Sequence, residues 1–268
     1  MGSLKVTVIT INFNGARSLE KTILSVLEQS YPNIEYIIID GGSTNGSLPI
    51  IKKYETKIAR WISEPDGGVS DAFNKGIALA SGEWIGILNS DDWYEKQALE
   101  NMVLAAQKNP AAEVIHGNLQ IWNQDKKGMY ISPDDHLKNI EVDMIFNHPA
   151  SFVKKSAYQK YGVFETGYKR AMDYDLFLRF YKHGAQFFHL NFWVANMNLG
   201  GISDRHWVKA SQEVLRSQLH HTDSKIKPYL IFCYRILRTG LRMGLEKIGF
   251  NSVVIFYRNC QKRKQYVK

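Results

Sequence analysis

The sequence contains few cysteines, and this scarcity excludes two kinds of small protein. Only two of its 268 residues are cysteine, Cys233 and Cys260, and both lie near the C-terminus. That number is too small for a disulfide framework or for a zinc module built from cysteine ligands. We therefore expect a reducing compartment and a fold held together by its hydrophobic core, for which a 44% share of apolar residues is sufficient.

Long apolar runs are also absent from the sequence. No apolar stretch reaches the roughly 20 residues that a helix needs to span a bilayer. The first residues, Met1 to Lys5, lead directly into a strand-like run and show no apolar core or small-residue cleavage site of a secretory signal. These two features predict a cytoplasmic protein without a transmembrane helix.

Positive charge is scarce over most of the chain. The net charge is +8, from 34 Lys and Arg against 26 Asp and Glu. The segment from Lys225 to the C-terminus carries +10, so the preceding 224 residues carry −2, the difference between the two values. A nucleic-acid-binding domain is usually basic over one face or throughout. A near-neutral body with a basic tail does not fit that pattern, and we expect no nucleic-acid partner.

Two common nucleotide-binding motifs are missing as well. The glycine-rich segment Asp40–Gly46 is followed by Ser47, where a Walker A loop needs Lys, and it lacks the G-x-G-x-x-G spacing. A P-loop NTPase and a nicotinamide enzyme are therefore not supported. The segment is either a helix-capping turn or a ligand loop in which Asp40, directly after a strand, accepts hydrogen bonds from a base or ribose.

What the sequence does contain is a regular alternation of strand-like and helix-like segments. Apolar, β-branched runs predict strands at residues 4–11, 34–39, 59–62 and 84–88. Apolar residues at helical spacing predict helices around residues 19–27, 50–54 and 70–80. This βαβ repetition predicts an α/β fold with a mostly parallel sheet that helices cover on both faces.

Beyond residue 113 the pattern is less regular. Short strands are predicted near residues 114–122 and 128–131, and helices near 154–161 and 174–183. We predict one domain over residues 1–224, with halves at 1–112 and 113–224, followed by a basic tail over 225–268.

Polar residues follow the apolar runs at the points where the predicted strands end. Asn12, Asp40 and Asp66 follow three of these strands, and Asp91 and Asp92 form a carboxylate pair after a fourth. Open α/β sheets bind ligands beyond the carboxyl ends of their strands. Adjacent carboxylates suit Mg²⁺ or Mn²⁺ when a diphosphate completes the site, although loop acids are often only solvated.

A series of short motifs lies between residues 5 and 94. They are Val6–Asn14, Ser25–Pro32, Ile39–Thr44, Glu64–Asp66, Asn74–Gly76, Ser81–Gly82 and Asn89–Asp92. In order and spacing they resemble the N-terminal half of the family 2 inverting glycosyltransferases. Looser matches extend this resemblance over about three quarters of the chain, at Asn147–Pro149, Asp173–Leu176 and Gly200–Ser203. The basic tail lies outside it.

The resemblance implies a GT-A fold and the transfer of a sugar from a nucleotide diphosphate with inversion, using Mn²⁺ or Mg²⁺. The fold would combine a Rossmann-like nucleotide-binding sheet over residues 1–112 with an irregular acceptor-binding half over 113–224. A UDP-sugar is the preferred donor, and GDP- and dTDP-sugars stay open. By motif position, the donor contacts would be Thr10, Asn12 and Asp40 for the nucleoside, Asp66 for its base or ribose, Asp91 for the ribose or diphosphate, and Asp92 for the metal. The family often has Asp where Asn89 stands, which leaves Asp92 as the best metal ligand.

Inverting transfer needs a carboxylate that takes a proton from the attacking acceptor hydroxyl. The family places this base in an acidic pair before a helix, and the segment Met172–Leu176 matches that pattern. We favour Asp173, because Asp175 lies deeper in the helix and could pair with Arg179 four residues on. As an isolated motif, Asp173 could equally be a helix cap.

Three further residues are candidates for the acceptor or diphosphate. His148 could line the acceptor site because similar enzymes often carry His there, and His206 could approach the diphosphate or the metal. Trp93, next to the acidic pair, could stack on a sugar. Each residue also has a purely structural interpretation, as a satisfied histidine or a core aromatic side chain.

The basic tail is rich in both apolar and basic residues. Arg235, Arg238, Arg242 and Lys247 recur at helical intervals beside Leu, Ile and Phe, which is typical of a helix lying on an anionic membrane. A basic helix packed on the domain is the alternative. We therefore predict a peripheral enzyme on the inner face of the cytoplasmic membrane that extends a lipid-linked saccharide for surface polysaccharide. A sugar-nucleotide pyrophosphorylase and a non-catalytic, membrane-associated nucleotide-binding adaptor are the alternative functions.

Overall fold

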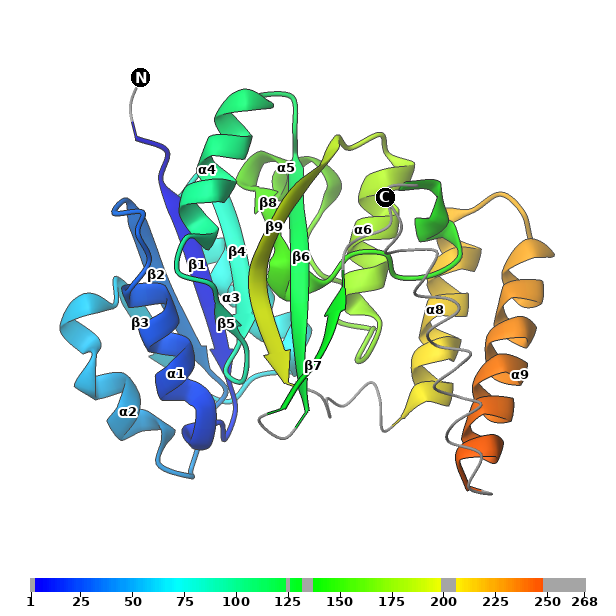
Figure 1. Cartoon of the computed structure of the whole chain (residues 1–268), viewed down its shortest axis with the longest axis horizontal. Helices are drawn as coiled ribbons and strands as arrows, with labels where there is room; N and C mark the ends of the chain where they lie inside the picture. Colours follow the sequence, from blue (N-terminus) through cyan, green and yellow to red (C-terminus); the bar gives the residue numbers. More distant parts are fainter. Residues whose placement is uncertain (1–2, 124–125, 132–136, 199–205, 248–268) are drawn as a thin grey trace.

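The described residues of the computed structural model form one mixed sheet of nine strands with helices on both faces (Figure 1). The structure describes residues 3–123, 126–131, 137–198 and 206–247. The strands are β1 (Val6–Asn12), β2 (Ile34–Asp40), β3 (Arg60–Ser63), β4 (Trp84–Asn89), β5 (Trp93–Tyr94), β6 (Val114–Asn123), β7 (Lys126–Ile131), β8 (Ser151–Lys154) and β9 (Phe187–Asn198). The α-helices are α1 (Ala16–Leu27), α2 (Ser47–Lys53), α3 (Val69–Leu79), α4 (Ala98–Lys108), α5 (Lys155–Tyr161), α6 (Met172–Lys182), α8 (Trp207–His221) and α9 (Lys227–Lys247). Short 3₁₀ helices are η1 (Glu55–Lys57), η2 (Leu137–Glu141) and η3 (His148–Ala150).

The sheet has a parallel half and a mixed half. The strand order is β3-β2-β1-β4-β8-β6-β9-β5, with β7 paired to β6. β3, β2, β1 and β4 are parallel, which confirms the expected βαβ alternation. β8 is antiparallel to both β4 and β6, and β9 is parallel to β6. The irregular pattern after residue 113 therefore reflects a sheet in which consecutive strands no longer lie side by side.

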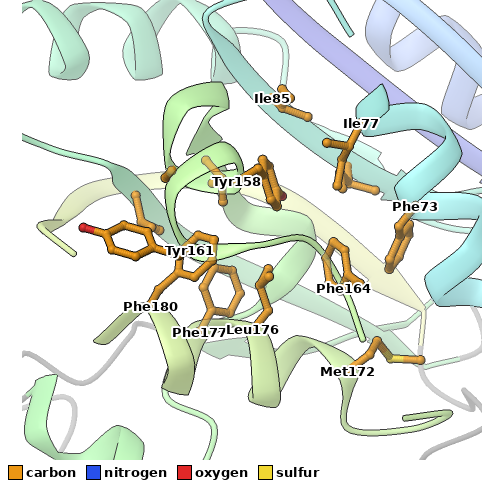
Figure 2. Packing of buried hydrophobic residues seen from close by; sticks show 14 of the residues in the cluster. Phe73, Ile77, Ile85, Tyr158, Tyr161, Phe164, Met172, Leu176, Phe177 and Phe180 are labelled. Carbon is orange, nitrogen blue, oxygen red and sulfur yellow. The ribbon is translucent and has the colours of Figure 1, made fainter. Parts of the chain in front are cut away.

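Helices cover each face of the sheet because its central strands are apolar on both sides. In β1, Val6 and Val8 pack toward α1, α2 and α4, whereas Ile9 and Ile11 pack toward α3, α5 and α6. Figure 2 shows the second of these layers, in which the Phe164 ring lies between Phe73 of α3, at 4.8 Å, and Tyr158 of α5, at 6.3 Å. Both layers consist of buried hydrophobic side chains, which hold the sheet in place and so support the loops at its ends.

Chain direction brings several loops to one edge of the sheet. β1, β2 and β4 are parallel and end there, with Asn12 beside Asp40 in register. β6 and β9 run the same way, because β8 is antiparallel to both β4 and β6. α6 connects to the start of β9, so the first turn of α6 returns to this edge. Figure 1 shows these ends together at the bottom of the view, and we call this the carboxyl edge.

The C-terminal helices lie beside the sheet. α8 packs against α6, and α9 packs against α8 (Figure 1). Lys227 and Arg235 of α9 form ion pairs with Glu141 and Asp143, so this helix is attached to the domain as the packed-helix alternative requires. Among the described residues, no helix is both long enough and apolar enough to cross a membrane. The part of the predicted tail after Lys247 lies outside the described residues.

Candidate active site

The loops after β1 and β2 are joined by a buried polar network. Asn12 donates from Nδ2 to Asp40 Oδ1 at 2.5 Å and to Ser43 Oγ at 3.0 Å, and its Oδ1 accepts the Gly15 N–H. Asp40 also accepts hydrogen bonds from the Ser43 amide and hydroxyl and from the Ser63 hydroxyl. Burial alone would raise the pKa of Asp40, but these hydrogen bonds, led by that from Ser43, lower it. Asp40 is therefore a fixed negative charge at the carboxyl edge.

The loop after β3 also reaches the carboxyl edge, next to the loops after β1 and β2. A Cβ added to Gly41 would lie 2.6 Å from Asp66 Oδ2 and 3.4 Å from the Phe13 ring, so three strand ends converge within contact distance. Asp66 accepts the Gly68 N–H at 2.8 Å. Phe13 is 68% exposed although it is a large aromatic residue. The sequence interpretation did not single out Phe13, whose exposed ring beside a carboxylate offers a flat surface to a planar ligand.

The predicted carboxylate pair forms a turn that neighbouring elements hold in place. Thr22 of α1 donates to the Asp92 carbonyl at 2.7 Å, and Asn198 of β9 donates to the Asp91 carbonyl at 2.9 Å. Asp91 is exposed, whereas Asp92 is only 1% exposed. The pair thus presents one outer and one inner carboxylate.

The inner carboxylate has the features of a cation ligand. Asn89 donates to Asp92 Oδ2 at 3.0 Å, but the buried Oδ1 has no hydrogen-bond partner among the described residues. Burial, together with the charge of Asp91, raises the pKa of Asp92 well above its usual value. A buried carboxylate oxygen without a partner is costly, and a divalent cation would satisfy it. The residues therefore fit a Mn²⁺ or Mg²⁺ ion.

The rest of the coordination shell is not supplied by side chains that the structure describes. In this part of the chain, no three His, Cys, Asp or Glu side chains gather in one place. A metal held by one or two carboxylates usually takes its other ligands from water and from substrate phosphates. The site is accordingly suited to a metal that arrives with a diphosphate.

Asn89 has a clear structural role at the position where the resembling family often has Asp. Its amide donates to Asp92, which a carboxylate at position 89 could not do. A third carboxylate beside Asp91 and Asp92 would add repulsion in the absence of a cation. Asn89 thus holds Asp92 in place without adding negative charge.

Asp173 lies in the first turn of α6 at the carboxyl edge. Its Oδ1 accepts the Tyr174 N–H at 2.8 Å, and burial raises the pKa of its carboxyl group. The loop before it is tied to the start of α3, because the Ser70 hydroxyl donates to the Tyr168 carbonyl at 3.3 Å. α3 itself follows the Asp66 loop, so Asp173 and the donor loops belong to one connected edge. A carboxyl group with a raised pKa suits a general base.

Asp175 is engaged elsewhere, which supports the choice of Asp173. Asp175 is 1% exposed and its Oδ1 accepts hydrogen bonds from Ser217 at 2.9 Å and from His221 at 3.0 Å. The predicted pairing with Arg179 is present at 3.9 Å. These partners make Asp175 part of the contact between α6 and α8.

α8 also holds the backbone that leads into Asp173. Glu213 Oε2 accepts the N–H groups of Lys169, Arg170 and Ala171 at 3.0, 2.7 and 2.9 Å. One carboxylate therefore satisfies three successive amides at the start of α6, where backbone donors lack helical partners. The sequence interpretation missed Glu213, because its partners lie more than 40 residues away in the chain.

The remaining predicted residues lie in varied surroundings. Thr10 is fully buried and shares a hydrogen bond with Tyr36, so its side chain does not reach the carboxyl edge surface. The His148 ring packs on Phe73 at 4.9 Å, and burial lowers the pKa of His148 to about 4, which keeps it neutral. His206 is exposed at the start of α8.

Trp93 has both a cation and another aromatic ring close to it. The Lys21 ammonium lies 3.0 Å from the ring centroid, and the Trp122 ring centroid is 5.6 Å away. The stacking of a sugar on Trp93 stays a prediction. The predicted motif Gly200–Ser203 lies outside the described residues.

A mixed sheet whose parallel half ends in these polar loops, with one exposed and one buried carboxylate at its carboxyl edge, is typical of nucleotide-binding α/β proteins. Comparison with known families identifies which family of such proteins the chain belongs to. The sequence model described as Glycosyl transferase family 2 matches residues 7–177, which is more than half of the chain. The protein belongs to this family.

Curated relatives carry glycosyltransferase names. An uncharacterized glycosyltransferase of Mycobacterium tuberculosis is 35% identical over 181 residues, covering 65% of this chain and 68% of that protein. The chondroitin synthase of Pasteurella multocida is 28% identical over 191 residues, which are 69% of this chain but only 20% of the synthase. The chain therefore corresponds to one part of the larger enzyme.

Solved structures show the same fold. Residues 1–349 of Staphylococcus aureus TarS superpose with a TM-score of 0.66 at 17% identity, covering 90% of this chain and 74% of that one. A mannosyltransferase of Pyrobaculum calidifontis, in complex with GDP-Man and Mn²⁺, gives 0.63 at 16% identity and covers 98% of this chain and 81% of that one. The fold is GT-A, as the motifs implied, and the protein is a glycosyltransferase.

Proposed function

We propose that this glycosyltransferase moves a sugar with inversion from a nucleotide diphosphate sugar, preferentially a UDP-sugar, to a saccharide acceptor, using Mn²⁺ or Mg²⁺. The observation that carries the proposal is the buried Asp92 with its unpartnered Oδ1. It lies at the same sheet edge as the loops of Asn12, Asp40 and Asp66. Solved structures of TarS with UDP and with UDP-GlcNAc support the choice of a uridine nucleotide.

The nucleoside is proposed to lie over the loops after β1, β2 and β3. Asp66 is proposed to accept hydrogen bonds from a base or ribose. Asp40, which is buried and already accepts hydrogen bonds from Asn12, Ser43 and Ser63, is proposed to shape the nucleoside-binding loop together with Asn12. Phe13, exposed beside Gly41 and Asp66, is proposed to stack on the base. Thr10 supports this region from inside the sheet through its hydrogen bond to Tyr36.

The diphosphate is proposed to lie at the Asp91–Asp92 turn. Asp92 would hold the metal through Oδ1, and Asp91 would contact the metal-bound diphosphate or the ribose. A bound divalent ion offsets the negative charge that develops on the leaving diphosphate. His206, at the start of α8, is proposed to approach the diphosphate from the acceptor side.

Asp173 is proposed as the general base. The acceptor hydroxyl oxygen forms a bond to the anomeric carbon while the bond from that carbon to the diphosphate breaks, and the hydroxyl proton passes to Asp173. One displacement of this kind inverts the configuration. His148 and Trp93 are proposed to line the acceptor side, His148 as a neutral hydrogen-bonding group and Trp93 as an apolar wall.

We further propose that the acceptor is a lipid-linked saccharide and that the enzyme works at the inner face of the cytoplasmic membrane in surface-polysaccharide assembly. This proposal is supported by the composition of the tail, which combines a charge of +10 from Lys225 onward with apolar residues.

The reaction can be tested with a panel of nucleotide sugars, Mn²⁺ and extracted membrane lipids as acceptor. We expect release of a nucleoside diphosphate, a lipid-bound sugar of inverted anomeric configuration, and loss of transfer in Asp173→Asn. Glu83→Gln is the matched control, since Glu83 is an exposed carboxylate just before β4, at the edge of the sheet opposite the carboxyl edge. Free pyrophosphate would instead indicate a pyrophosphorylase, and a product of retained configuration would contradict the single displacement.

A further inference from the structure

The outer face of α9 carries an uncovered apolar surface. Ile226, Leu230, Tyr234, Leu237 and Leu241 follow one another at intervals of four, four, three and four residues, which places them on one side of the helix. They are between 54% and 73% exposed. Single exposed apolar residues are ordinary, whereas a continuous row of five marks a binding surface. We call these five residues the outer stripe.

The opposite face of α9 is fixed to the domain. Arg235 lies on this face and forms an ion pair with Asp143, whereas Lys227, at the edge of the outer stripe, pairs with Glu141 at 2.7 Å. Figure 1 shows α9 as the outermost described helix, with α8 between it and the sheet. The outer stripe therefore faces away from the protein and is held in a fixed orientation.

Charge identifies the occupant of this surface. The segment from Lys225 to the C-terminus carries +10, whereas the rest of the chain carries −2. Lys227 and Arg238, which flank the outer stripe, keep 53% and 40% of their side chains exposed. A second copy of the chain would bring the same positive segment against this one, and the two would repel each other. An anionic bilayer supplies both the apolar interior and the opposite charge.

We propose that the outer stripe inserts at the boundary between headgroups and acyl chains of an anionic lipid bilayer, with α9 lying in the membrane plane. This inference rests on the proposed function, because the use of a membrane-bound helix to the enzyme would be to bring it to a lipid-linked acceptor. In Figure 1 the Lys247 end of α9 points the same way as the carboxyl edge of the sheet.

The first test measures co-sedimentation of the full chain with vesicles of phosphatidylcholine, with or without phosphatidylglycerol. We expect binding to the anionic vesicles only, weakening as salt is raised. Leu230→Gln combined with Leu237→Gln should weaken binding about tenfold or more, because two exposed leucines that would be buried on insertion are lost. The control combines Leu104→Gln with Val163→Gln, which are exposed apolar residues outside α9 and should leave binding unchanged.

A second test measures the polarity around the outer stripe when the protein is bound to vesicles. Cys233 is exposed and lies on the same side of α9 as the outer stripe, three residues after Leu230 and four before Leu237. An environment-sensitive fluorophore attached to Cys233, in a chain with Cys260→Ser, should shift to the blue on anionic vesicles. Quenching by lipid-borne quenchers should be strongest near the headgroup boundary.

Each alternative occupant gives a different result. If the wild-type protein does not co-sediment with anionic vesicles, the inference is wrong. If it is a dimer without lipid and the Leu230/Leu237 variant is a monomer, a second copy covers the outer stripe instead. If that variant still binds, while replacing Lys262, Arg263 and Lys264 by glutamine abolishes binding, the terminal charges act without the stripe. None of these assays contains nucleotide or sugar, so their failure is separate from failure of the proposed transfer.

Discussion

Replacing Glu213 by alanine is expected to lower the free energy of unfolding by about 2–4 kcal/mol. The carboxylate accepts three backbone N–H groups, from Lys169, Arg170 and Ala171, at 2.7–3.0 Å. Hydrogen bonds to a charged group contribute about 1.5–3 kcal/mol each. In the variant, water can bond to the partly exposed amides, so the net loss is smaller than the sum of the three contributions. For a chain of this size the change corresponds to a fall of about 4–10 °C in melting temperature.

The assay is urea unfolding followed by circular dichroism. Glu213→Gln keeps one acceptor oxygen without the charge and should lie between wild type and alanine. Gln212→Ala, an exposed neighbour on α8, is the matched control and should change stability by less than about 0.5 kcal/mol. Since Glu213 holds the backbone before Asp173 and, in the described part of the chain, contacts none of the loops that carry Asp40, Asp66 and Asp92, transfer should fall while nucleotide binding is retained. Wild-type stability and transfer in Glu213→Ala would refute the reasoning.

Three further predictions concern single carboxylates and their partners. Although burial raises the pKa of Glu35, hydrogen bonds led by that from Ser81 hold it at about 2, below the usual 4.5. A lowered pKa means that Glu35 stabilises the fold above about pH 4.5 and loses this effect as the pH falls toward 2, so the urea midpoints of wild type and Glu35→Ala should converge as the pH falls from about 4.5 to 2. Transfer by the wild type should rise with pH through the raised pKa of Asp173, and Asp173→Asn should abolish transfer without weakening nucleotide binding. Asn89→Asp should lower the melting temperature without metal by adding repulsion to Asp92, and Mn²⁺ with UDP should raise it more than in wild type.

Each of these three predictions has a result that would contradict it. A constant difference between wild type and Glu35→Ala from pH 7 to pH 3 would show that the charge of Glu35 is not the stabilising feature. Undiminished transfer in Asp173→Asn would move the base to another residue. An Asn89→Asp variant that is as stable as wild type in EDTA would exclude the proposed repulsion.

The parallel half of the fold could be predicted from the sequence because its signals are local. β-branched runs buried on both faces mark β1, β2 and β4, and the predicted ends differ from the observed ones by a few residues. α4 was missed although Leu99, Met102 and Val103 repeat at helical spacing and are buried. The helical spacing of apolar residues, which predicted the other helices, also predicts this one.

The second half was less accessible for physical reasons. α8 buries Ser217 and Gln218 beside Val214, so its contact with α6 is largely polar and leaves no apolar period to detect. In β9 polar and apolar residues are mixed along Phe187–Asn198, and its parallel partner β6 lies some 70 residues earlier in the chain. Such elements are defined by their partners and not by their own composition.

In the candidate site, too, some residues carry a local sequence signal and others are defined only by contacts between distant parts of the chain. The order of motifs made Asp92 and Asp173 candidates, and the structure adds what each one contacts. The internal hydrogen bonds of Asp40, and the engagement of Asp175 by His221 46 residues away, depend on three-dimensional contacts. Phe13 carried no signal in the sequence, because an aromatic residue after a strand is usually buried.

The most direct test of the account is the melting temperature of the intact protein with UDP, GDP, dTDP or CMP, each with Mn²⁺, Mg²⁺ or EDTA. A ligand that binds only the folded state stabilises it by about 2.7 kcal/mol at one hundred times its dissociation constant. The account predicts a rise with UDP that requires the metal, disappears in Asp92→Ala and persists in the control Asp143→Asn. No rise with any nucleotide and metal, or an equal rise in EDTA and in Asp92→Ala, would contradict the central claim that Asp92 binds a metal–diphosphate complex.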